Sequence, residues 1–166
     1  ADDVTREIIR DQMNEPYRTM LGHFRHEVGH YVWDRLVRDD GRLESFRKVF
    51  GDEREDYQAA LQRHYENGPP SDWPEHHVSA YAATHPWEDF AESFAHALHI
   101  VDTLETARAF GLAVDDARLE PLGDPYKCVS GKRLAEAWIP LTIAMNAIHK
   151  SMGQKDFYPF VLTPDI

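Results

Sequence analysis

The chain has 166 residues, enough for one compact domain with its own core, and a hydrophobic share of 42% is ordinary for a folded soluble protein. A formal net charge of −11, with scattered basic residues, argues against binding to nucleic acid or an anionic membrane, and no apolar run is long enough to span a bilayer. The single Cys128 excludes an internal disulfide and a cysteine-based zinc knuckle and favours a reducing compartment, so we predict a cytoplasmic protein.

Apolar residues at helical spacing predict a first helix that starts at about Glu15 or Pro16 and ends at Arg38. The chain then reaches Gly41, which can take the left-handed conformation that closes a helix. Six apolar residues define the stripe that we expect this helix to bury: Leu21, Phe24, Val28, Tyr31, Val32 and Leu36.

The remainder of the chain is also predicted to be mainly helical. We expect short helices at 43–50 and 55–66, an irregular connection at 72–85, and long helices at about 87–110 and 130–152. Pro86 suits the first turn of the third of these helices, and Pro140 is expected to kink or interrupt the last. No segment alternates clearly enough to predict a strand. The sequence therefore predicts a mainly α fold in a single domain over residues 1–166.

Residues 26–30, His-Glu-Val-Gly-His, form an H-E-x-x-H motif inside the first predicted helix. Residues four apart share one helix face, so His26 and His30 can direct both imidazoles at a point where zinc would accept their nitrogens. Glu27 can reach a water on that metal but is poorly placed to be a ligand itself. A glycine in mid-helix costs about 1 kcal/mol relative to alanine, and close approach of another element would explain Gly29.

A catalytic zinc needs a third protein ligand, and the helix that follows Pro86 offers one. Glu88 and Glu92 lie one turn apart on one face, flanked by the small Ala91 and Ala95, which would let two helices approach closely. Two stacked carboxylates repel each other unless a cation binds one and a proton donor the other. We therefore predict that Glu88 is the third ligand and that Glu92 accepts the free N–H of a ligand histidine. The alternative is that both carboxylates simply face water.

These motifs resemble known families. The H-E-x-x-H string, followed well downstream by Glu-Asp-Phe-Ala-Glu at 88–92, resembles the gluzincin arrangement of zinc peptidases and is similar to the catalytic site of anthrax lethal factor. Stretches at 22–36, 79–107 and 151–162 resemble a bacterial family of zinc-binding metallopeptidases, so the resemblance covers nearly the whole chain. Members of that family are longer and carry an N-terminal zinc-ribbon module. The resemblance therefore implies a zincin-like helical core, the C-terminal catalytic part of such a protein, with a small β-sheet that lies upstream and is missing or minimal in this chain.

The resemblance implies a zinc metallopeptidase with one Zn²⁺ per chain, held by His26, His30 and Glu88. Glu27 would act as general base, taking a proton from the water that the metal activates and passing it to the leaving amine. Tyr81, seven residues before Glu88, matches a tyrosine that assists the reaction in lethal factor, and we expect it to stabilise the oxyanion. The implied partner is a peptide or protein substrate, and the sequence names neither that substrate nor the oligomeric state.

Two interpretations from other classes stay open at this point. Residues 27–30 also form an E-x-x-H motif, which a di-iron carboxylate helical protein would combine with a second E-x-x-H and two further glutamates; the Glu92 helix offers E-x-x-x-H instead. A non-catalytic zincin-like module would use zinc only to join helices, and it would have no use for Glu27. The sequence does not assign roles to four further histidines, His23, His85, His96 and His99.

Overall fold

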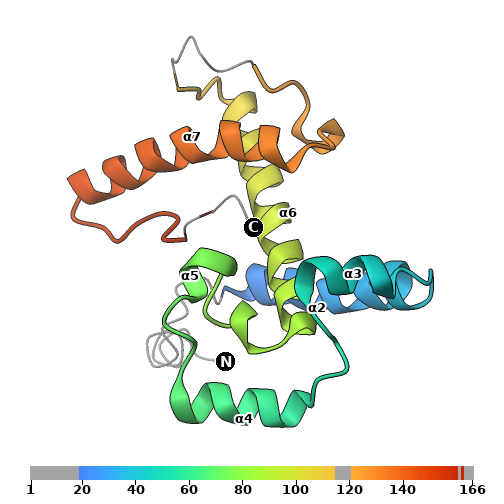
Figure 1. The fold of residues 1–166 in the computed structure, drawn as a ribbon. Coiled ribbons are helices and arrows are strands. Elements are labelled where there is room, and N and C mark those ends of the chain that lie inside the picture. The colour runs from blue at the N-terminus through green and yellow to red at the C-terminus, as the bar shows by residue number, and fades with distance from the viewer. Residues whose placement is uncertain (1–18, 115–120, 161, 163–166) are drawn as a thin grey trace. The chain divides into compact units, whose positions relative to one another are not determined.

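The computed structural model describes residues 19–114, 121–160 and 162, and every regular element within them is a helix (Figure 1). The α-helices are α2 (Met20–Trp33), α3 (Leu43–Phe50), α4 (Tyr57–Asn67), α5 (Trp73–His76), α6 (Pro86–Ala109) and α7 (Gly131–Ser151). The other described elements are a π-helix, η1 (Asp34–Arg38), and two 3₁₀ helices, η2 (Ala82–Thr84) and η3 (Pro125–Lys127). The predicted mainly α class is therefore confirmed for this part of the chain. The described residues contain no strand, and the small upstream sheet implied by the resemblance stays a prediction.

The chain divides into two compact units. The first contains the described residues up to His96, and the second runs from Ala97 to Leu162, so α6 passes from one into the other. All six residues predicted for the metal site lie in the first unit. The prediction of a single domain stays a prediction.

Helix α2 begins at Met20 because Thr19 caps it: the Thr19 hydroxyl accepts a hydrogen bond from the Gly22 N–H at 3.0 Å. The predicted start at 15–16 lies outside the described residues. From Asp34 the helix widens into the π-helix η1 and ends at Arg38, the predicted end.

The face that α2 buries is not the predicted one. Its buried residues are His26, Gly29 and Trp33. Four of the six residues in the predicted stripe are exposed: Leu21, Phe24, Tyr31 and Leu36. Periodicity shows that a helix has two different faces, but it cannot show which of them the neighbouring helix covers.

Close packing of α2 against α6 depends on small residues. A Cβ built on Gly29 would lie 2.9 Å from the Cα of Ala91, nearer than real Cβ atoms come to backbone. Ala91 and Ala95 are both buried. The close approach expected at this glycine is therefore confirmed, and it brings the histidine-bearing face of α2 against the first turns of α6.

An aromatic cluster holds η1 and α3 beside this helix pair. Trp33, Val37 and Phe46 are buried at its centre, and the rings of Trp33 and Phe46 meet edge to face at 5.6 Å between centroids. Trp87 and Phe90, from the start of α6, pack against them. The cluster thus fixes the beginning of α6, where the predicted carboxylates lie.

Several other helix ends follow the local signals in the sequence. Helix α6 starts at Pro86 and ends just before Gly111, whose φ of +68° favours glycine, and α3 matches its prediction of 43–50. Helix α7 continues through Pro140, so that proline does not interrupt it. The connection at 72–85, predicted to be irregular, contains α5 and η2. None of the described helices has the length and apolar character needed to cross a membrane.

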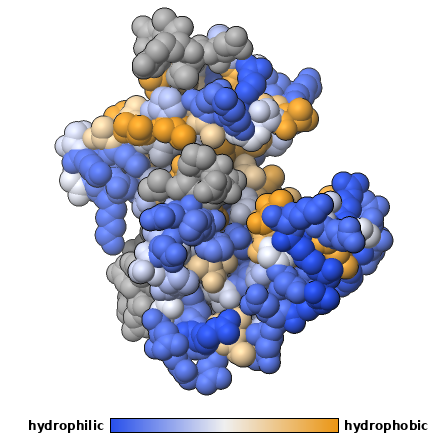
Figure 2. All heavy atoms as spheres, in the orientation of Figure 1, coloured by the Kyte–Doolittle hydropathy of each residue, from blue (hydrophilic) through white to orange (hydrophobic). Residues whose placement is uncertain are grey.

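The second unit contains α7 and the C-terminal part of α6. Trp138 of α7 and Tyr158 are buried with ring centroids 5.0 Å apart, and the Asn146 side chain bonds both the N–H and the C=O of Tyr158. The chain after α7 is therefore held to that helix by side-chain contacts. Figure 2 shows hydrophobic residues on the surface of α7, where Ile139 and Ile143 are exposed.

Candidate metal centre

Three potential ligand atoms meet between α2 and α6. The Nε2 atom of His26 lies 2.9 Å from Oε2 of Glu88 and 3.0 Å from Nε2 of His30, and the third side of the triangle, His30 Nε2 to Glu88 Oε2, is 3.4 Å. Glu88 is 2% exposed and His26 8%. Two ligands bound to one tetrahedral zinc at 2.0–2.1 Å stand about 3.3 Å apart. The spacing therefore suits a single small cation.

Two buried polar atoms of these side chains have no hydrogen-bond partner within the described part of the chain, one in the triangle and one on the far side of the His30 ring. Glu88 Oε2 and His30 Nδ1 are buried without a hydrogen-bond partner among the described residues. Nδ1 of His26 lies 2.7 Å from Oε1 of Glu92, so in the neutral ring Nδ1 carries the proton and Nε2 presents a lone pair. Converging lone pairs in a buried site are costly unless a cation or a proton binds them. Two imidazoles and one carboxylate are also a donor set of catalytic zinc sites, so the residues present fit the metal.

The two carboxylates beside His26 also favour a positive charge at this site. Burial by itself would lower the pKa of His26, but its contacts with Glu88 and Glu92 raise it to about 9. Burial would raise the pKa of Glu88, but contacts with His26, His30 and Tyr57 lower it. A proton on His26 therefore balances the two carboxylates when no metal is bound, and a metal must displace that proton.

Glu92 positions the His26 ring and is itself held in place. Its Oε2 accepts a hydrogen bond from the Ser79 hydroxyl at 2.7 Å, while its Oε1 faces His26. Burial would raise the pKa of Glu92, and the contacts with His26 and Ser79 lower it, so the carboxylate stays ionised. The Ser79 oxygen in turn accepts from the Ala82 N–H at 3.0 Å. The histidine, the carboxylate and the start of η2 thus form one hydrogen-bonded chain.

Tyr57, which the sequence did not predict, binds the other carboxylate oxygen of Glu88. Its hydroxyl donates to Oε1 of Glu88 at 2.6 Å. Burial, and then the Glu88 charge, raise the pKa of Tyr57, so the phenol remains a neutral donor. The residue occupies the first position of α4, where the Asp56 side chain caps the helix by accepting from the Ala59 N–H at 3.0 Å. A contact across 31 residues leaves no local pattern in the sequence that would predict it.

The two residues predicted to be catalytic lie outside the ligand triangle. The Tyr81 ring is 6.0 Å from the His26 ring between centroids, and a hydrogen bond joins Tyr81 to Tyr57. Glu27 has a side chain that is 58% exposed, with its Oε1 3.7 Å from Nε2 of His23. The structure therefore gathers His26, His30, Glu88 and Glu92, with Tyr81 beside them and Glu27 open to solvent.

Trp87 covers the second histidine. Its ring and that of His30 lie 3.9 Å apart between centroids, at an interplanar angle of 40°. Trp87 also contacts Trp33 of the aromatic cluster at 6.1 Å. The aromatic cluster therefore limits the orientation of the His30 ring through Trp87.

Taken together, these contacts define a helical protein with a buried two-histidine, one-glutamate group that could hold a metal ion. The chain belongs to the family described as "Putative zinc-binding metallo-peptidase", which matches residues 1–166. This membership confirms the predicted resemblance to a bacterial zinc-metallopeptidase family.

Uncharacterized proteins of Mycobacterium tuberculosis and Mycobacterium bovis are similar to this chain. Each is 48% identical over 164 residues, which cover 98% of this chain and 47% of the relative. The chain thus spans about half the length of these curated relatives. No solved structure matches the chain.

Proposed function

We propose that this protein is a zinc-dependent peptidase in which His26, His30 and Glu88 hold one Zn²⁺ and Glu27 is the general base. The observation that carries the proposal is the meeting of three buried ligand atoms, none more than 3.4 Å from another, on an H-E-x-x-H helix and its neighbour. Membership of a zinc-binding metallopeptidase family supports the same reaction. A gluzincin-type arrangement, with the glutamate ligand on a second helix, follows from these assignments.

The bound metal would supply Lewis acidity that activates water and polarises a peptide carbonyl. Glu27 is next to the ligand His26 and its carboxylate is solvent-exposed, which suits a base that must take a proton from an incoming water and deliver it to the leaving amine. The Tyr81 hydroxyl would donate a hydrogen bond to the developing oxyanion. Glu92 fixes the tautomer of His26, and Tyr57 fixes the orientation of Glu88.

The di-iron alternative fits these contacts less well. Such a site needs bridging carboxylates and a second E-x-x-H. Both oxygens of Glu92 are already engaged, one by His26 and the other by Ser79. Within the described residues the potential metal-binding group consists of His26, His30 and Glu88 alone.

Glu27→Gln in the whole, zinc-loaded protein tests the proposal. The substitution removes the base and preserves the ligands, so we expect cleavage to fall on the order of 10²–10⁴-fold while zinc content stays at one per chain. Cleavage is read by mass spectrometry of a diverse peptide library, and zinc by elemental analysis. Glu44→Gln, an exposed glutamate on α3, is the matched control and should keep wild-type activity. Wild type that cleaves nothing beyond what Glu27→Gln cleaves contradicts the proposal.

A further inference from the structure

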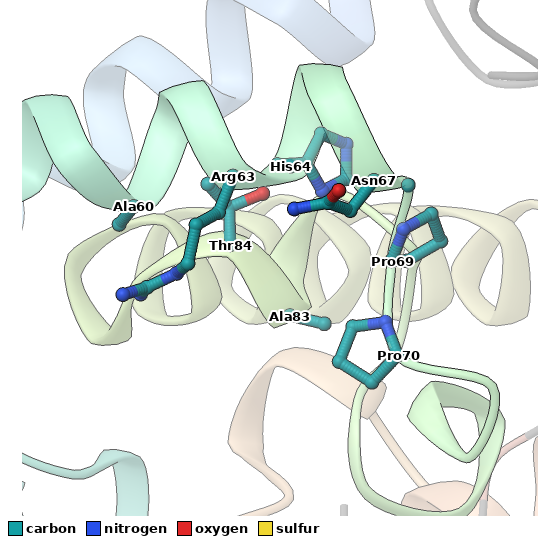
Figure 3. A pocket seen from close by; sticks show the side chains of 9 residues that line it. Ala60, Arg63, His64, Asn67, Pro69, Pro70, Ala83 and Thr84 are labelled. Carbon is teal, nitrogen blue, oxygen red and sulfur yellow. The ribbon is translucent and has the colours of Figure 1, made fainter.

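A cavity of about 390 Å³ lies between α4 and the residues just before α6 (Figure 3). Its polar lining comes from Arg63, His64 and Asn67 of α4 and from Thr84 of η2. Figure 3 shows these side chains around one hollow. The volume is in the range of small-molecule sites and is sufficient for one large amino-acid side chain.

Part of the cavity lining is apolar and comes from two prolines that follow α4. Helix α4 ends at Asn67, and Gly68 follows with a φ of +74°, a conformation that favours glycine and turns the chain. Pro69 and Pro70 come next and line the cavity. Proline fixes its own backbone angle, so this part of the lining costs little entropy to hold in place when a ligand binds.

One buried polar group in the cavity lacks a partner. Thr84 is 7% exposed, and its hydroxyl makes no hydrogen bond with the described residues. A buried hydroxyl without a partner costs free energy, so Thr84 is a polar group of the lining whose hydroxyl is still unsatisfied among the described residues. Polar residues from both α4 and η2 thus contribute to the lining of the cavity.

Arg63 gives the cavity its charge. In a chain of net charge −11, six described arginines form ion pairs with carboxylates, but Arg63 pairs with none of the described ones. Burial lowers the pKa of His64, so its ring is neutral near pH 7 and Arg63 is the cation of the lining. A guanidinium binds carboxylates with two parallel hydrogen bonds, so a carboxylate is the ligand group that this lining favours.

Two ring contacts connect the cavity to the metal centre. The rings of His64 and Tyr81 meet edge to face at 5.9 Å between centroids, and the Tyr81 ring lies 6.0 Å from that of His26. An extended peptide covers such a path with about four residues. A substrate with its scissile bond at the metal could therefore place one of its own groups in the cavity.

We propose that the cavity is a substrate subsite that binds a carboxylate of the peptide, supplied by an acidic side chain or by the terminal carboxyl group. Arg63 pairs with the carboxylate, and the side-chain amide of Asn67 donates a hydrogen bond to it. This inference rests on the proposed peptidase function and adds the class of substrate. It predicts that the enzyme selects peptides by a negative charge a few residues from the cleaved bond.

The test measures binding, so that it is separate from the test of catalysis. The whole protein is prepared zinc-loaded with Glu27→Gln, which leaves peptides intact, and with Arg63→Met or the control Arg54→Met added to it. Arg54 is an exposed arginine that pairs with Asp52 outside the cavity. The probes are fluorescent decapeptides of neutral sequence with an amidated C-terminus, each with a single Glu at a different position. Two controls accompany them: the same peptides with Gln in place of Glu, and the neutral sequence with a free C-terminal carboxylate. Anisotropy gives each Kd.

At least one peptide with a carboxylate should bind about 10- to 100-fold more tightly than its Gln or amidated counterpart. Arg63→Met should remove that preference and Arg54→Met should preserve it, with zinc content equal in all samples. Preference for an internal Glu identifies an acidic side chain as the source, and preference for the free C-terminus identifies a terminal carboxylate. An equal preference in Arg63→Met, or no preference for either carboxylate in the parent protein, overturns the subsite. If the binding preference is found but wild type cleaves no more than Glu27→Gln, the proposed catalysis is overturned and the subsite stands.

Discussion

The two faces of α2 are the reverse of those of an ordinary surface helix. His26 and Gly29 are buried against α6, whereas Leu21, Phe24 and Tyr31 on the other side are 53%, 66% and 64% exposed. A surface helix normally buries its apolar stripe and exposes its polar residues. Trp33 is the apolar exception on the covered side; elsewhere on α2 the contacts of His26 and the space needed for close packing decide which side is covered more than hydropathy does.

The two faces also differ in how much a single substitution should cost. Buried imidazole and carboxylate groups cost several kcal/mol each unless they have partners. Here His26 has Glu88 and Glu92 as partners, and these carboxylates have Tyr57 and Ser79. The buried face therefore works as a set in which a single loss has a large effect, whereas a loss on the exposed face should have little.

Removing Glu88, the proposed third ligand, should have the largest effect on the buried face of α2. We expect Glu88→Gln to weaken zinc binding by on the order of 10³-fold, because even loss of a residue behind a ligand typically costs 10- to 100-fold. Competition with a chromophoric chelator measures the affinity, and circular dichroism checks the fold. Glu44→Gln should bind zinc like the wild type. A Glu88→Gln affinity within threefold of wild type would show that another group is the third ligand.

The meeting of His26, His30 and Glu88 could be predicted from the sequence because the predicted site residues obey local spacing rules. His26 and His30 are one helical turn apart, and so are Glu88 and Glu92. The boundaries of α6 were predictable for a similar reason, since its flanking proline and glycine act on their own backbone. Such local signals do not depend on contacts with distant parts of the chain.

The errors and omissions concern contacts between distant parts of the chain. The buried face of α2 was predicted wrongly because periodicity contains no information about which neighbour packs on which face. Tyr57 and Ser79 were missed because their partners lie 31 and 13 residues away along the chain. The cavity beside Arg63 was missed for the same reason. Its walls come from α4 and η2, and no motif joins them.

Adding one carbon to the buried face should destabilise the protein. In Gly29→Ala the new Cβ would lie 2.9 Å from the Cα of Ala91, so backbone must move. We expect a loss of about 2 kcal/mol in the free energy of unfolding, although alanine favours helix by about 1 kcal/mol over glycine. Urea denaturation of the metal-free protein measures it. In Gly131→Ala, at the start of α7, the Cβ meets nothing within 4 Å, and stability should stay equal or rise slightly. Equal behaviour of the two variants would contradict the close packing.

The pH dependence of zinc binding probes the proton held in the buried set. With the pKa of His26 raised to about 9, zinc must displace roughly one proton from this ring at pH 7. Zinc affinity should therefore rise with pH up to about 9 and then level off. The stabilisation that protonated His26 gives the metal-free protein is complete below its unfolded value of 6.5 and is lost as pH rises through about 9. Calorimetry in buffers of different ionisation enthalpy counts the protons, and no release at pH 7 would exclude a protonated His26.

A polar substitution on the exposed face should have the smallest effect. Phe24 is 66% exposed, so Phe24→Ser should change the free energy of unfolding of this chain by no more than about 0.5 kcal/mol and leave zinc affinity unchanged. Thermal and urea denaturation measure the first, and chelator competition the second. The same substitution at Trp33, which is 8% exposed on the buried side, should cost several times more. A loss above about 1 kcal/mol for Phe24→Ser would mean that this apolar side is covered in solution. Both faces of α2 would then be buried, and they would differ only in what covers them.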